Sequence, residues 1–198
     1  MNSIEKIIKC FRKFPSVGPK QAERFAMYVM KSAEEEISEL VNSIIEVKST
    51  IKQCSKCYNY TSNEVCDICS DKNRDPKTIC IVENPFDIIA IEKTGIYNGL
   101  YFILGSYIIP QSSSSIFLNR IDFLKDRIQK EGVEELIIAL NTTTEGQASA
   151  LYIKDSLKNI VPKISRIAFG VPLGADIDYI DEFTLSYALK GRTPIDGK

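Results

Sequence analysis

The chain has 198 residues, 44% of them hydrophobic, so it is long and apolar enough to bury a core. Its formal net charge is −1 and it contains no histidine, which excludes Ser-His-Asp and Cys-His catalysis and leaves cysteine or carboxylate as zinc ligands. No apolar run approaches the roughly 18 residues that span a bilayer, and the charged N-terminus is not typical of a secretory signal, so we expect a cytoplasmic protein with no membrane partner.

The first 53 residues predict three helices. Apolar residues recur at helical spacing over 4–11, over 22–30 and over 37–51. Charge is distributed unevenly: residues 1–31 carry seven basic and two acidic residues, whereas residues 79–198 carry twelve basic and fifteen acidic residues. A basic head on an acidic body favours an anionic partner at the head. A solvated helical face would give the same pattern.

A short turn with the sequence FPSVGP, residues 14–19, separates the first two predicted helices. Gly18 permits a tight turn with outward-pointing amides, and Pro19 suits the first position of the next helix. The N-terminus of that helix offers free amides to an anion, and Lys20 and Arg24 share one helical face beside it. Gly18, Lys20 and Arg24 are therefore candidates for gripping a DNA phosphate without reading bases. A plain helical hairpin remains the alternative.

The segment 54–70 is polar and contains two Cys-x-x-Cys pairs, made by Cys54, Cys57, Cys66 and Cys69. Each pair directs two thiolates to one point, and two pairs complete a tetrahedron around zinc. Zinc binding is strong enough to fold a segment that has little core of its own. A redox pair lacks its βαβ context here, and disulfides do not fit a chain without a secretion signal. We expect a closed structural zinc site, with the other two cysteines, Cys10 and Cys80, in apolar cores.

Residues 70–77 are interpreted as a linker, and from residue 79 the pattern alternates between strands and helices. Buried strands are predicted at 79–82, 101–104, 136–140 and 164–169, and helices at about 85–93, 117–130, 145–158 and 181–190. Strands that alternate with helices indicate an α/β fold with a mainly parallel sheet covered on both faces. The stretch 111–115 is predicted to be a serine-rich loop.

Together, the hairpin of the form PxVGPK-x3-R, the four-cysteine knuckle and the α/β part resemble the RecR family of recombination mediators over nearly the whole chain. Specific matching blocks lie at 81–88 (IVENPFDI), 90–95 (AIEKTG), 104–105 (LG), 139–146 (ALNTTTEG) and 170–174 (GVPLG). The resemblance implies a helix-hairpin-helix module at 1–53, a zinc knuckle at 54–70, a Toprim-type domain at 77–172 and a C-terminal extension at 173–198.

The chain departs from the family pattern at three places. Ser16 stands where the hairpin usually has a second glycine, so a slightly different turn is expected. Residues 110–115, PQSSSS, replace a DGIGP-like run, and the contacts of that loop do not carry over. Glu145 is followed by Gly146 and Gln147, where the family often has Glu-Gly-Glu.

The resemblance also implies a function. Members of the family are DNA-binding proteins of recombinational DNA repair and form ring-like homo-oligomers, dimers or tetramers, that engage DNA through the hairpin face. With the partner proteins RecO and RecF they help to load the recombinase RecA on single-stranded gaps. No catalytic turnover is attributed to RecR itself. The expected location is the bacterial cytoplasm, in association with the nucleoid.

Toprim enzymes hold Mg²⁺ with an acidic residue after the first strand and an Asp-x-Asp after a later one, because Mg²⁺ prefers anionic oxygen. Glu83 is in the first place, but Asn141 and Thr143 stand where the aspartates would be, and Glu145 is out of register. We expect the acidic group of Glu83, Asp87 and Glu145 to dock a basic partner instead. A Mg²⁺-dependent Toprim nuclease and a zinc-stabilised interaction module without a DNA role are the alternatives.

Overall fold

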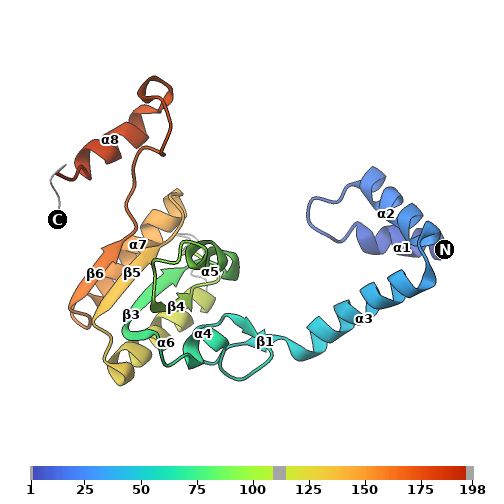
Figure 1. The fold of residues 1–198 in the computed structure, drawn as a ribbon, viewed down its shortest axis with the longest axis horizontal. Helices are drawn as coiled ribbons and strands as arrows, with labels where there is room; N and C mark the ends of the chain where they lie inside the picture. Colours follow the sequence, from blue (N-terminus) through green and yellow to red (C-terminus); the bar gives the residue numbers. More distant parts are fainter. Residues whose placement is uncertain (1, 109–114, 195–198) are drawn as a thin grey trace. The chain divides into compact units, whose positions relative to one another are not determined.

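The computed structural model describes residues 2–108 and 115–194, and the chain divides into two compact units, Met1–Ile51 and Lys52–Lys198. The first unit contains the three predicted helices, α1 (Ser3–Phe11), α2 (Pro19–Lys31) and α3 (Glu34–Thr50) (Figure 1). The rings of Phe11 and Phe25 join α1 to α2 with their centroids 5.5 Å apart. Ala22 and Ala26 of α2 are the buried residues of these three helices, so the unit has a very small core.

Cys10 is exposed in this small unit, and its expected place in a core is wrong. Cys80, in contrast, is buried in the second unit as predicted.

The cysteine-rich segment forms a two-stranded antiparallel sheet of β1 (Lys52–Gln53) and β2 (Tyr60–Thr61), followed by the short helix α4 (Asp67–Ser70). The predicted linker at 70–77 is shorter than expected, because β3 begins at Asp75. It is also anchored: the Arg74 guanidinium forms an ion pair with Glu92 and donates to the carbonyl of Gly99 at 3.1 Å. The segment therefore fixes the start of the sheet.

The sheet of the second unit is parallel and has the order β4-β3-β5-β6. Its strands are β3 (Asp75–Val82), β4 (Gly99–Ile103), β5 (Glu135–Ala139) and β6 (Lys163–Arg166). The connecting helices are α5 (Pro85–Glu92), α6 (Ser115–Glu131) and α7 (Thr144–Leu157). These elements confirm the predicted alternation of strands and helices, and β3, β4 and β5 are buried as expected. The buried strand predicted at 164–169 is wrong in its burial, because β6 covers only Lys163–Arg166 and lies at the edge of the sheet, where its side chains are exposed or half-buried.

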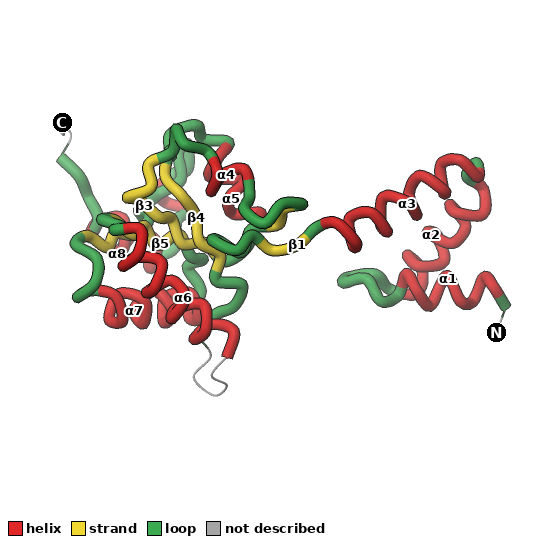
Figure 2. The backbone as a smooth tube through the Cα atoms, turned by 90° about the horizontal axis from the view of Figure 1, so that it is seen from below, coloured by secondary structure: helices red, strands yellow, loops and turns green. Residues whose placement is uncertain are grey.

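Successive side chains of β3 point to opposite faces of the sheet and enter two separate cores. Ile79 and Ile81 pack with the buried residues of α6 and α7, whereas Cys80 and Val82 pack with Ile88 of α5. The sheet thus lies between α5 on one face and α6 with α7 on the other (Figure 2). Both faces are covered, as the continuous apolar runs predicted.

The chain continues through a 3₁₀ turn (Ile177–Tyr179) into α8 (Glu182–Lys190). The ring of Tyr187 lies 5.8 Å from that of Phe169, and Arg166 stacks 4.3 Å above Phe169, so α8 contacts the end of the sheet. Of the serine-rich loop predicted at 111–115, only Ser115 falls within the described residues, and it begins α6. Within those residues, every helix is too short or too polar to cross a bilayer.

Candidate metal centre and nucleic-acid interface

The four predicted zinc ligands converge. The sulphur atoms of Cys54, Cys57, Cys66 and Cys69 all lie within 4.8 Å of one another, and three of these residues are buried. The Cys57 and Cys66 sulphurs are 3.5 Å apart. A zinc tetrahedron with bonds of about 2.3 Å needs sulphurs about 3.8 Å apart. The donor set and its spacing therefore fit Zn²⁺, with all four positions taken by protein.

Backbone groups of the knuckle already point at the thiolates. The amides of Lys56 and Cys66 donate to the Cys54 sulphur at 3.4 and 3.3 Å. A hydrogen bond from Cys57 lowers the pKa of Cys66 to about 2, and the same bond raises the pKa of Cys57. The thiolate is the form that binds zinc, and the two amide donors at Cys54 suit a metal-bound sulphur.

The knuckle is docked on the edge strand β4. The amide of Ile103 donates to the carbonyl of Cys57 at 3.0 Å. Tyr58 adopts a φ of 64° and places its ring 5.6 Å from Phe102 and 5.3 Å from Phe123. The knuckle has little core of its own, so it packs Tyr58 against the core of the α/β unit. It also covers a sheet edge that would otherwise expose unpaired backbone groups.

Two arginines of α6 complete this docking, and sequence reasoning missed both. Arg120 donates to the carbonyl of Ile103 at 2.9 Å and stacks 4.3 Å above the Tyr58 ring. Arg127 donates to the carbonyls of Lys56 at 3.0 Å and of Tyr101 at 3.1 Å. Their spacing of seven residues, two helical turns, was the only signal of a shared face.

The turn before α2 differs from the expected one. Ser16 adopts a φ of 63°, the left-handed conformation that glycine favours, so serine holds the place of the family's second glycine with glycine-like geometry. Gly18 has an ordinary φ of −79°, and a Cβ built there would meet nothing within 4 Å. The expectation that Gly18 makes the tight turn is therefore wrong. Its missing side chain leaves open space outside the backbone.

The start of α2 is exposed and lacks a side-chain cap. Gly18 is the N-cap residue and Pro19 follows it, so no side chain accepts from the first amides of the helix. Lys20 and Arg24 are exposed, and within residues 2–108 and 115–194 neither takes part in an ion pair. Of the three predicted DNA-binding residues, Gly18 and Lys20 thus lie at the exposed first turn of α2, and Arg24 lies in the next turn.

The three predicted acidic residues lie at the carboxyl end of the sheet but have different surroundings. Glu83 accepts hydrogen bonds from the Tyr107 hydroxyl at 2.6 Å and the Asn141 amide at 2.7 Å. Asp87 accepts from the backbone amide of Glu83 at 3.1 Å and helps to cap α5. Glu145 is exposed in the first turn of α7.

These residues make a poor two-metal site, because two of the three carboxylates are partly engaged by protein donors. One oxygen of Glu83 is occupied by two neutral donors, and one oxygen of Asp87 is occupied by helix capping. Burial, followed by the hydrogen bond to Glu83, raises the pKa of Tyr107 to about 12, so this hydroxyl remains a donor. Among the residues that the structure describes, the four cysteines are the one group whose side chains gather closely enough to hold a metal.

Comparison with known proteins accounts for nearly every part of the chain. Consecutive matches are to the RecR helix-hairpin-helix (residues 4–48), the RecR four-cysteine zinc finger domain (51–71), the Toprim domain (77–168) and the RecR C-terminal region (170–193). Relatives called recombination protein RecR, from Clostridium perfringens, Rubrobacter xylanophilus and Rippkaea orientalis, are 43%, 40% and 39% identical. The similarity covers 98%, 96% and 98% of this chain, and 97%, 96% and 98% of those relatives.

The chain belongs to the RecR family. Membership confirms the predicted combination of a helix-hairpin-helix element, a four-cysteine zinc finger and a Toprim-type α/β domain. It also agrees with the sulphur geometry, so structural zinc at the four cysteines is confirmed as the cofactor of this RecR family member.

Proposed function

We propose that this RecR family member is a DNA-binding recombination mediator without catalytic turnover, and that the hairpin turn before α2 is its DNA contact. In this proposal it acts in the cytoplasm at the nucleoid with RecO and RecF, and it helps to load RecA on single-stranded gaps. The relatives' name, recombination protein RecR, supports the process.

The uncapped, exposed N-terminus of α2 is the observation that carries the DNA contact. Free amides at a helix start carry partial positive charge and form an anion site. Lys20 and Arg24 add two cations that no carboxylate of the described residues neutralises. The open space at Gly18 lets a phosphate approach the backbone closely. These groups recognise the DNA backbone rather than a base sequence.

The acidic group of Glu83, Asp87 and Glu145 is proposed to dock a basic partner protein. The engagement of one Glu83 oxygen by Tyr107 and Asn141 supports a role in binding over a role in two-metal catalysis. Glu145 is exposed and free of ion pairs among the described residues, so its charge is available to a partner. Complementary charge of this kind directs association and selects partners.

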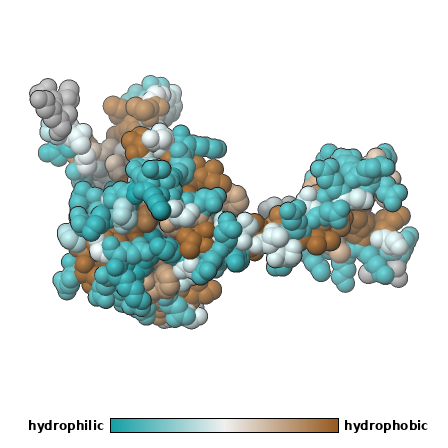
Figure 3. Space-filling model, turned by 60° about the horizontal axis from the view of Figure 1, so that its bottom comes forward, coloured by the Kyte–Doolittle hydropathy of each residue, from teal (hydrophilic) through white to brown (hydrophobic). Residues whose placement is uncertain are grey.

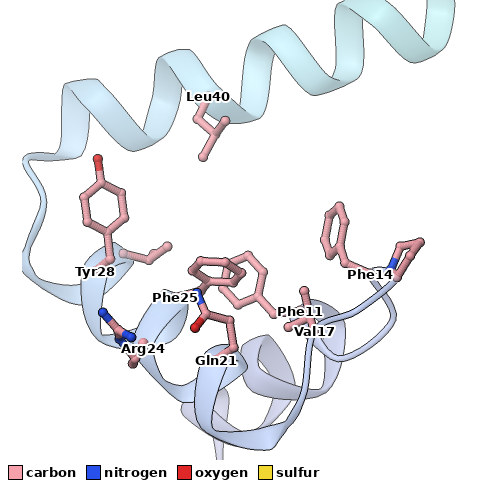
Figure 4. A pocket seen from close by; sticks show the side chains of 10 residues that line it. Phe11, Phe14, Val17, Gln21, Arg24, Phe25, Tyr28 and Leu40 are labelled. Carbon is pink, nitrogen blue, oxygen red and sulfur yellow. The ribbon is translucent and has the colours of Figure 1, made fainter. Parts of the chain in front are cut away.

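Assembly into a homo-oligomer is supported by apolar surface in the first unit, where apolar residues are visible in Figure 3. The α3 side chains of Ile44, Ile45 and Val47 are 57%, 60% and 59% exposed. A groove of about 740 Å³ is lined by Phe11, Phe14, Phe25, Tyr28, Leu40 and their neighbours (Figure 4). Because exposed apolar patches of this kind mark interaction sites, a second copy of the chain is the proposed occupant.

Gly18→Ala tests the DNA contact, because the new methyl group meets no atom of the protein. The variant is expected to remain folded by circular dichroism. Its affinity for DNA should fall about tenfold or more, since a lost hydrogen bond to a charged group costs about 1.5–3 kcal/mol. Lys154→Ala, on an exposed face of α7, is the control and should bind as wild type does. Unchanged DNA binding by Gly18→Ala would remove the hairpin from the interface.

A further inference from the structure

Arg127 is an unusually buried cation beside the zinc knuckle. It lies on α6 and is only 5% exposed. Its Nη1 atom donates to the carbonyl of Lys56 within the knuckle and to the carbonyl of Tyr101 in β4. Its Nε atom donates to Glu131 at 2.8 Å. The side chain therefore joins the metal-binding segment to the sheet through one charged group.

The third nitrogen of this guanidinium has no partner. Nη2 of Arg127 is buried and donates to no acceptor among the residues that the structure describes. A buried donor without an acceptor is destabilising, and more so when it is charged. Such a group needs a compensating charge nearby.

The thiolates of the zinc centre supply that charge. Four thiolates around one Zn²⁺ carry a net charge of about −2, and this charge is buried with them. The Arg127 guanidinium reaches this centre through the carbonyl of Lys56, which lies between the ligands Cys54 and Cys57. Glu131 offsets part of the Arg127 charge, but it also pairs with Lys56 at 3.3 Å, so the three side chains together remain positive.

We propose that Arg127 compensates the charge of the four-cysteine zinc centre, and that it thereby sets how tightly the metal is held as well as fixing the knuckle to the sheet. The inference is carried by the orphaned, buried Nη2 of a side chain that hydrogen-bonds Lys56, between two of the cysteine ligands.

Arg120 provides a matched comparison on the same helix. It lies two turns before Arg127 and also joins the knuckle to β4, through Gln53, the Tyr58 ring and the Ile103 carbonyl. None of these three residues is a metal ligand. Removing Arg120 should therefore weaken the docking of the knuckle without removing a charge from the thiolates.

The experiment measures zinc transfer from the purified full-length protein to a chromophoric chelator at neutral pH, with folding followed by circular dichroism. Arg127→Gln keeps amide donors but loses the charge, and it should weaken zinc binding about 10–100-fold, the usual effect of losing an outer partner of a metal site. Arg127→Lys restores the charge and should recover most of the affinity. Arg120→Gln should weaken zinc binding much less than Arg127→Gln does, because it loosens the docking without removing the compensating charge.

Glu131→Gln gives an independent test that does not depend on the folding of an Arg127 variant. This change leaves Arg127 with its full charge, so zinc should be held at least as tightly as in wild type. Weaker zinc binding by Glu131→Gln would show that Arg127 acts by orientation alone. Wild-type zinc affinity in Arg127→Gln, or equal losses in Arg127→Gln and Arg120→Gln, would also overturn the proposal.

Discussion

Cys57→Ser removes one of the four zinc ligands and tests how far the metal stabilises the fold. The buried residues of the knuckle are mainly its cysteines, so the knuckle depends on the metal for its shape. Losing the metal should therefore also loosen Tyr58 from β4 and expose the edge of the sheet. Loss of a structural metal belongs with the mutations that cost about 4 kcal/mol or more. For a chain of this size each kcal/mol lowers Tm by about 2–4 °C, so a fall of roughly 8–16 °C is expected.

The assay combines zinc content, thermal melting and hydrogen exchange of two adjacent amides. The Ile103 amide donates to the Cys57 carbonyl, whereas the Leu104 amide donates to Val82 inside the sheet. In Cys57→Ser the first amide should exchange much faster while the second stays protected. Cys10→Ser, the same substitution at an exposed cysteine, is the control and should retain about one zinc per chain. A zinc-free Cys57→Ser protein with unchanged melting and a protected Ile103 amide would refute the reasoning.

Ser16, Glu92 and Glu83 can each be tested by a single substitution. Ser16→Gly should stabilise the first unit by up to about 1.5 kcal/mol in denaturant titrations. It relieves about 1–2 kcal/mol of left-handed strain, and the extra freedom of glycine in the unfolded chain offsets about 0.5–1 kcal/mol of that gain; a less stable variant would contradict this. The hydrogen-bonded ion pair with Arg74 holds the pKa of Glu92 below its ordinary 4.5. The stability that this pair contributes is therefore present above pH 4.5 and is lost as the pH falls through the lower pKa of the folded state. Glu92→Gln should show a smaller loss of Tm on acidification than wild type, and equal losses would be the contrary result. Neither wild type nor Glu83→Ala should cleave DNA with Mg²⁺ or Mn²⁺, and cleavage that Glu83→Ala abolishes would establish the nuclease alternative.

Much of the second unit could be predicted from local patterns. Apolar runs of four or five residues marked β3, β4 and β5, because a parallel sheet covered on both faces buries consecutive side chains. The run at 164–169 marked β6 but not its exposure, which depends on its place at the edge of the sheet. The Cys-x-x-Cys spacing predicted the metal centre, since a short knuckle directs its two thiolates regardless of the rest of the fold. The boundaries proposed between the four parts of the chain remain predictions.

Other features depend on tertiary structure and have no local signal. Arg127 flanks the predicted apolar face of α6, but its partners, Lys56 and Tyr101, are 71 and 26 residues away. The left-handed Ser16 was unexpected because serine seldom adopts that conformation. Cys10 was placed in a core because helical periodicity marks an apolar face without saying whether a partner covers it.

The most direct test of the proposed function compares two double variants in DNA-binding titrations over a range of salt concentrations. Lys20→Ala with Arg24→Ala removes the two cations beside the start of α2, and Lys154→Ala with Lys158→Ala removes one cation from α7 and one from its C-cap. The hairpin variant should bind all sequences more weakly, and its slope of log affinity against log salt should fall by roughly two units, about one for each lost phosphate contact. The α7 variant should keep the wild-type slope. A folded hairpin variant with wild-type affinity and slope would contradict the central claim.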